Sequence, residues 1–155
     1  MLPIAHLHPI AVHFPIVFFL SLAAFDTISL IRGDAISGRT CAANVSAGLA
    51  VLAGLTAIVT FILGDLAYDE AISSGVAATQ LETHEALGTW TAALIVAWAL
   101  LRGYLWWRGS PMEGSGKKVA VAIEIAGAIL IATTAYFGGQ LVYELGVNVS
   151  RAAGG

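Results

Sequence analysis

The sequence predicts an all-α fold, an integral membrane bundle of four helices that run alternately up and down. Three observations lead to this prediction. Hydrophobic residues make up 58% of the 155 residues and charged residues 11%, whereas soluble domains contain about 25% charged residues. The apolar residues are gathered into four long runs, and the basic residues are gathered into the connections on one side. A chain of this length cannot hide so much apolar surface from water, so its natural solvent is a lipid bilayer.

We expect a single transmembrane domain over residues 1–155, with spans at about 9–31, 41–65, 80–107 and 119–145. Each run is long enough to cross the hydrocarbon core, which takes about 20 helical residues. Pro9 suits the first turn of the first helix. Pro15 removes a hydrogen bond to the Ala11 carbonyl, which predicts a kink. The stretch from Asp65 to Ala78 is expected to be the only sizeable loop on its side of the membrane.

The distribution of Lys and Arg sets the expected orientation, because cytoplasmic connections carry an excess of these residues. Six of the seven basic residues flank the connection between the first two runs or the connection between the last two: Arg32, Arg39, Arg102, Arg108, Lys117 and Lys118. This side is predicted to be cytoplasmic. An even number of spans then places both termini outside, so we expect a multi-pass protein of the bacterial inner (plasma) membrane with periplasmic termini.

All four histidines are expected at the external end of the bundle, because the first and third helices run parallel. An ionisable side chain at membrane depth is unfavourable without a partner and is a candidate for function. Two neutral imidazoles from facing helices can hold the iron of haem b. The sequence therefore predicts a bis-histidine haem b with His13 and His84 as its axial ligands. His8 is the reserve ligand or a partner for a propionate.

Two further residues are expected to support this site. Gly88, one turn after His84, would leave a notch in which a flat macrocycle approaches the backbone. Asp65, at the external end of the second run, is expected either to fix the tautomer of a ligating imidazole or to be an ordinary helix-end carboxylate. A second haem that uses His6 and His8 is the alternative to a single haem.

A bare metal ion is the rival ligand for the same part of the chain. Three or four nitrogen and oxygen donors would bind Zn²⁺ or Cu²⁺, and such an ion with an open position could activate water. The candidate donors are spread over three runs of the sequence: His6, His8, His13, Asp65, His84 and Glu85. Their spacing matches no known metal motif. Cys41 is the only cysteine, which excludes an internal disulfide and a cysteine-pair motif.

Two acidic residues, Asp26 and Glu124, lie inside apolar runs toward the cytoplasmic end. An acid at that depth would serve a proton path or a quinone site. The alternative is that they reach the nearby interface or pair with Arg32 and Lys117. No internal repeat is evident, beyond the position of both histidine-bearing runs at the same side of the membrane.

The opening string HPIxVHFP, residues 8–15, resembles the signature of a family of bacterial membrane proteins known as domain of unknown function 2231. Three later motifs resemble the same family, so the resemblance spans nearly the whole chain: Gly64-Asp65, His84-Glu85-x-Leu87-Gly88 and Gly138-Gly139-x-Leu141-Val142-Tyr143. It implies four helices and membrane residence, with no established activity. Family members resemble components of respiratory or redox modules, which favours haem. The motif positions include His8, His13 and His84 but not His6, which lowers the expectation of two haems.

These observations predict a small membrane b-type cytochrome that transfers electrons, rather than a stand-alone enzyme. Its expected partners are the lipid bilayer, a quinone and a periplasmic redox protein, with no nucleic acid, and it would act alone, as a homo-oligomer or as a complex subunit. The alternatives are a zinc- or copper-dependent membrane enzyme or metal-handling protein that uses the same histidines, and a non-catalytic subunit of a membrane redox complex.

Overall fold

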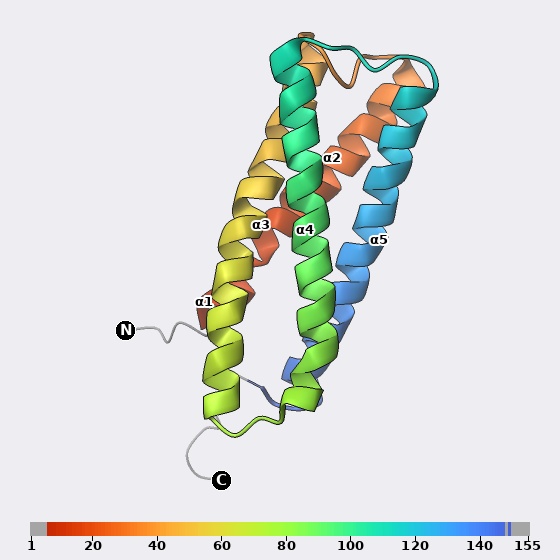
Figure 1. Ribbon diagram of the computed structural model, residues 1–155. Helices are drawn as coiled ribbons and strands as arrows, with labels where there is room; N and C mark the ends of the chain where they lie inside the picture. The colour runs from red at the N-terminus through yellow and green to blue at the C-terminus, as the bar shows by residue number, and fades with distance from the viewer. Residues whose placement is uncertain (1–5, 148, 150–155) are drawn as a thin grey trace.

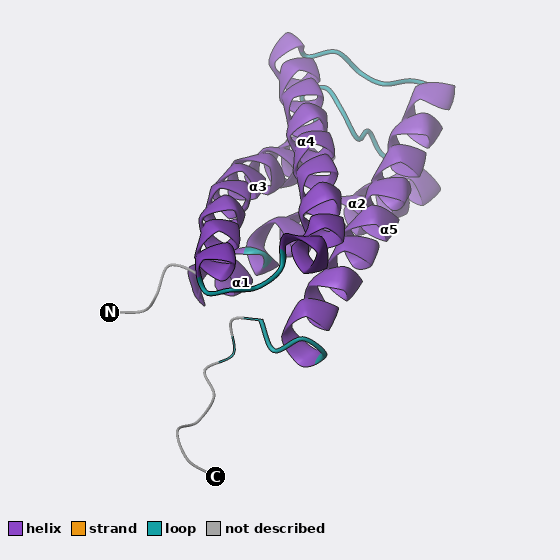
Figure 2. Cartoon of the chain, turned by 60° about the horizontal axis from the view of Figure 1, so that its bottom comes forward, coloured by secondary structure: helices purple, strands orange, loops and turns teal. Residues whose placement is uncertain are grey.

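The computed structural model describes residues 6–147 and 149. The described residues form five helices and no strands (Figures 1 and 2): α1 (Leu7–Ala11), α2 (His13–Arg32), α3 (Cys41–Ser73), α4 (Ala78–Arg108) and α5 (Ser115–Tyr143). A short interruption at Val12 separates α1 from α2, so the two together make up one spanning segment. The predicted all-α bundle of four membrane-spanning segments is confirmed.

The four segments Leu7–Arg32, Cys41–Ser73, Ala78–Arg108 and Ser115–Tyr143 are long and apolar enough to cross a membrane. At 26 to 33 residues each, they are about 40 to 50 Å long, which exceeds a hydrocarbon core of about 30 Å. Their outer faces expose large apolar side chains, among them Val17, Leu55 and Ile129. This outward apolar surface is the one that lipid covers.

The two ends of the bundle differ in character. The connections 33–40 and 109–114 lie at one end, which we call the basic end (Figure 1). The start of α1, the connection 74–77 and the end of α5 lie at the other, which we call the histidine end. The predicted loop from Asp65 to Ala78 is wrong for most of its length, because α3 continues to Ser73. Residues 65–73 contain no Gly or Pro that would interrupt the helix, and polar side chains alone do not stop a helix that has left the lipid. The chain turns only at Gly75, which has a φ of 92°.

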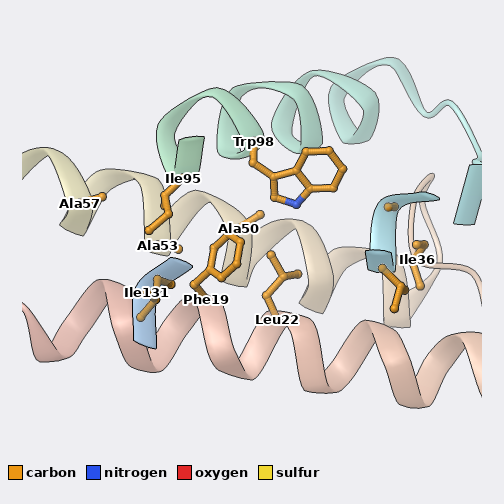
Figure 3. Close-up of a cluster of buried hydrophobic side chains, with 11 residues drawn as sticks. Phe19, Leu22, Ile36, Ala50, Ala53, Ala57, Ile95, Trp98 and Ile131 are labelled. Atoms are coloured by element: carbon orange, nitrogen blue, oxygen red, sulfur yellow. The ribbon is translucent and has the colours of Figure 1, made fainter. Parts of the chain in front are cut away.

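Each helix packs against two neighbours around the bundle, α2 on α3, α3 on α4, α4 on α5, and α5 back on α2. The core between them combines large side chains from α2, α4 and α5 with alanines from α3 (Figure 3): Phe19, Leu22, Ala50, Ala53, Ala57, Ile95, Trp98 and Ile131. The small residues let α3 approach α4 closely, and a Cβ at Gly54 would collide with Ala99. In lipid, this close packing holds helices together, because burying apolar surface from lipid gains little.

Pro15 interrupts the first segment, and the structure replaces the hydrogen bond that it removes. Pro15 has no N–H, so the Ala11 carbonyl lacks its usual partner four residues on. Thr60 Oγ1 of α3 donates to this carbonyl at 3.1 Å. An unpaired carbonyl is unfavourable inside a bilayer. This bond therefore satisfies the carbonyl and fixes α1 against α3.

We predict that Thr60→Val lowers the free energy of unfolding by about 0.5–1.5 kcal/mol, the net contribution of one hydrogen bond. Circular dichroism during denaturant unfolding in detergent micelles measures the change. Thr56→Val is the matched control, because Thr56 Oγ1 donates only to carbonyls of its own helix. In the Thr60→Val background, Pro15→Ala should recover stability by restoring an N–H for the Ala11 carbonyl. Equal losses in the two threonine variants would contradict the role of the cross-helix bond.

Candidate functional site

His8 of α1 and His84 of α4 lie beside each other at the histidine end. Their ring centroids are 6.5 Å apart, with an angle of 74° between the ring planes. Both side chains are half-buried. Imidazoles from the first and third spanning segments therefore converge, as the parallel direction of these segments predicts.

A backbone carbonyl of the neighbouring helix holds each ring. His8 Nδ1 lies 3.2 Å from the Thr60 carbonyl oxygen in α3, and His84 Nδ1 lies 3.2 Å from the Thr134 carbonyl oxygen in α5. A carbonyl oxygen only accepts, so in a neutral imidazole Nδ1 carries the proton and donates it. Nε2 of each ring then keeps its lone pair, and no hydrogen bond from the described residues reaches it. An Nδ1–H bonded to a carbonyl is the arrangement that orients an imidazole for metal ligation through Nε2.

A glycine lies against each ring, one helical turn after the threonine. A Cβ at Gly64 would lie 3.0 Å from Cε1 of His8, and a Cβ at Gly138 would lie 2.8 Å from Cε1 of His84. Both distances are shorter than ordinary van der Waals contact. A side chain at position 138 would therefore force the His84 ring to move, and one at position 64 would crowd the His8 ring.

The two histidine sites are copies of one arrangement. In each, Nδ1 of the ring bonds a threonine carbonyl, and Cε1 faces a glycine four residues after that threonine: His8, Thr60 and Gly64 in the first helical hairpin, and His84, Thr134 and Gly138 in the second. The structure therefore shows a local likeness between the two hairpins, whereas the sequence shows no evident repeat. In the sequence this likeness is carried by a Thr-x-x-x-Gly string that begins 52 residues after one histidine and 50 residues after another. Thr and Gly are common residues, so the string is not conspicuous.

His13, the residue that the sequence pairs with His84, lies elsewhere. It is exposed, and its Nδ1 lies 3.3 Å from the carbonyl oxygen of Ile10 in its own segment. His8 takes its place next to His84. Five residues separate the two candidates, which on a helix is about 140° around the axis. Only one of them can face the bundle interior, and the Thr60 carbonyl holds His8 there.

Among the described residues, neither of the two expected supporting residues forms a hydrogen bond with a histidine ring. Asp65 is exposed, and the role of fixing the tautomer that was considered for it belongs to the carbonyls of Thr60 and Thr134. At Gly88 an added Cβ would meet no atom within 4 Å. His6 is half-buried at the start of α1 and makes no capping hydrogen bond. Within residues 6–147 and 149, no group of three or more His, Cys, Asp or Glu side chains is gathered to hold a bare metal ion.

A cavity opens beside His84 between α4 and α5. Its volume is about 200 Å³, and its walls mix apolar and polar side chains: Gln80, Thr83, His84, Phe137, Gln140, Leu141, Glu144 and Leu145. His84 is therefore one of the residues that line this cavity.

A family model described as a predicted membrane protein, DUF2231, matches residues 5–151. The chain belongs to this family. The match confirms the family that the sequence motifs indicated, and it agrees with a bilayer as the protein's environment. Among curated proteins and among solved structures, none matches this DUF2231 protein.

The DUF2231 protein also has a polar cluster in its core that differs from the expectation. Asp26 and Glu124 are fully buried. Both pair with Arg102, at 2.7 and 2.6 Å from its Nη1, rather than with Arg32 and Lys117. Those two basic residues contact the connection 33–40 instead. Arg102, assigned above to a cytoplasmic connection, is 1% exposed and lies inside the bundle.

We predict that Gly138→Ala lowers the free energy of unfolding by about 1–3 kcal/mol, the usual effect of forcing an extra methyl group into a packed site. Gly88→Ala is the control, because its new methyl group meets open space and alanine favours a helix by up to about 1 kcal/mol. Denaturant unfolding in micelles measures both variants. A loss in Gly88→Ala as large as that in Gly138→Ala would show that the contact with His84 is not responsible.

Proposed function

We propose that this DUF2231 protein is a small b-type cytochrome of the bacterial inner membrane, with His8 and His84 as the axial ligands of one haem b. The observation that carries the proposal is the matched pair of imidazoles. Each has Nδ1 bonded to a carbonyl and Nε2 free of hydrogen bonds from the described residues, and the two rings lie side by side. When bound, haem supplies reversible one-electron chemistry that an all-protein site of these residues lacks.

The donor set fits haem better than a bare ion. A metal with two imidazoles on opposite sides lies about 2 Å from each nitrogen, and the ring centroids are then about 6 Å apart; the centroids of His8 and His84 are 6.5 Å apart, which is compatible with this arrangement. A porphyrin brings four nitrogen donors of its own, so two protein ligands complete the coordination. A bare Zn²⁺ needs three or four protein ligands, and the part of the chain that the structure describes contains no such group.

The surrounding residues of the chain have positioning roles in this proposal. The Thr60 and Thr134 carbonyls orient the rings and strengthen Nε2 as a donor, because they accept the Nδ1 proton. Gly64 and Gly138 let each ring lie against the backbone. The cavity beside His84 provides access for a small redox partner such as a quinone, and a periplasmic redox protein is the proposed partner on the water side.

The proposed orientation places the histidine end and both termini in the periplasm. Arg102 does not contribute to the positive charge of the connections, because it is buried in the core. Five of the seven basic residues still lie at the basic end: Arg32, Arg39, Arg108, Lys117 and Lys118. The excess of positive charge therefore continues to favour this end as cytoplasmic.

The proposal predicts that the protein, produced in a host that makes haem b and purified in detergent, shows a Soret band that shifts on reduction. His8→Ala and His84→Ala should each lose the band, because each removes one axial ligand. His13→Ala and His6→Ala are the matched controls and should keep it. Haem content per chain, measured as the pyridine haemochrome, should be close to one.

Other outcomes of this experiment separate the alternatives. If His13→Ala loses the band and His8→Ala keeps it, the axial pair is His13 and His84 instead. Stoichiometric zinc or copper without iron would favour a metal-ion protein. A folded preparation with neither haem nor metal would overturn the proposed function.

The orientation can be tested with the native cysteine. Cys41 is exposed at the start of α3, at the basic end. We predict that a membrane-impermeant maleimide does not label Cys41 in intact spheroplasts but labels it after permeabilisation. Ser74→Cys in a Cys41→Ser background places the thiol at the histidine end and should be labelled in intact spheroplasts. The reverse pattern would contradict periplasmic termini.

A further inference from the structure

One guanidinium and two carboxyl groups meet in the bundle core, toward the basic end. Arg102 Nη1 lies 2.7 Å from Oδ2 of Asp26 and 2.6 Å from Oε1 of Glu124. The three side chains are at most 1% exposed and come from α4, α2 and α5. The fourth helix, α3, contributes Ser46, whose hydroxyl donates to Oδ2 of Asp26 at 2.8 Å.

Hydrogen bonds account for one oxygen of each carboxyl group and leave the other without a partner. Besides Arg102, Oε1 of Glu124 accepts from Trp98 Nε1 at 3.0 Å. The second guanidinium nitrogen, Nη2, donates to the Ile36 carbonyl at 2.5 Å and contacts Ser46 Oγ. Oδ1 of Asp26 and Oε2 of Glu124 are buried and have no hydrogen-bond partner. A buried oxygen that carries charge is strongly unfavourable without a partner.

The charges do not balance if both acids are ionised. The groups that face the cluster are Asp26 from α2, Arg102 and Trp98 from α4, Glu124 from α5, Ser46 from α3 and the Ile36 carbonyl. Arg102 is the only cation among them, and an arginine keeps its charge in proteins. Two carboxylates would leave one negative charge in the middle of the bundle, where an unpaired charge is unfavourable.

We propose that Asp26, Glu124 and Arg102 form a proton-binding site, in which the two carboxyl groups hold one proton between them at neutral pH. The proton brings the cluster to zero net charge, with one carboxylate paired to the guanidinium. The proton-binding site is separate from the histidine site. Ser46 belongs to the first and Thr60 to the second, and they are 14 residues apart on α3, or about 21 Å.

The connections at the basic end cover the site on the proposed cytoplasmic side. Ile36, in the connection 33–40, is fully buried, and its carbonyl accepts from Arg102. The next residue, Ser37, donates through its hydroxyl to the Ser110 carbonyl at 3.0 Å, which joins the two connections. The connection 33–40 therefore contacts the proton-binding site directly and is bonded to the second connection.

Infrared spectroscopy of the full-length protein in lipid nanodiscs tests the proposal. At pH 7 the wild type should show the C=O stretching band of one protonated carboxyl group, and the band should shift in D₂O. Asp26→Asn and Glu124→Gln should each abolish it, because the remaining carboxyl group then pairs one-to-one with Arg102 and ionises. Asp34→Asn, which changes an exposed carboxylate paired with Arg32, is the matched control and should keep the band.

The same spectra in a His84→Ala background exclude a contribution from haem propionates, so the result does not depend on the proposed haem. Arg102→Gln should raise the band intensity about twofold, because neither acid then has a counter-charge. Circular dichroism verifies the fold of each variant, and either amide variant alone is sufficient for the test. A wild type without the band, or a folded amide variant that keeps it at full intensity, would overturn the proton-binding site.

Discussion

A backbone carbonyl that this chain carries into the bilayer must find its partner within the protein, because lipid offers none. The Ala11 carbonyl that Pro15 leaves open takes the Thr60 hydroxyl. The same threonine accepts the proton of His8 Nδ1 with its backbone carbonyl. One residue of α3 thus joins the break in the first segment to the orientation of an imidazole.

This constraint also separates the molecule into two polar regions with an apolar layer between them. At the histidine end, each of two imidazole rings has Nδ1 bonded to a carbonyl and Nε2 free of hydrogen bonds from the described residues. Toward the basic end, Arg102 of α4 contacts side chains from α2, α3 and α5. Between the two regions lie apolar side chains such as Phe19 and Ile131, which pack against the alanines of α3 (Figure 3). A redox centre and a proton site in these places would act on opposite sides of the membrane.

The sequence predicts the helical membrane fold well, because composition and run length respond directly to the bilayer. It predicts less about which side chains meet. His8 and His13 fit the motif equally. They differ in their direction around the helix axis, and the direction of His8 is fixed by a carbonyl far along the chain. Arg102 lies near the end of an apolar run, so a count of basic residues along the sequence assigns it to a connection. Its burial depends on its ion pairs with acids on two other helices. Such pairings depend on tertiary packing, which cannot be derived from the spacing of residues along one helix.

The repeated hairpin has a consequence for the charges in the core. Asp26 follows His8 by 18 residues, and Arg102 follows His84 by the same 18, so the two members of this ion pair occupy equivalent positions. Two identical hairpins assembled as a homodimer would place like charges there, either two acids or two guanidinium groups. In a single polypeptide the two equivalent positions can carry opposite charges. One chain thereby permits an attraction across the centre of the molecule that exact symmetry forbids.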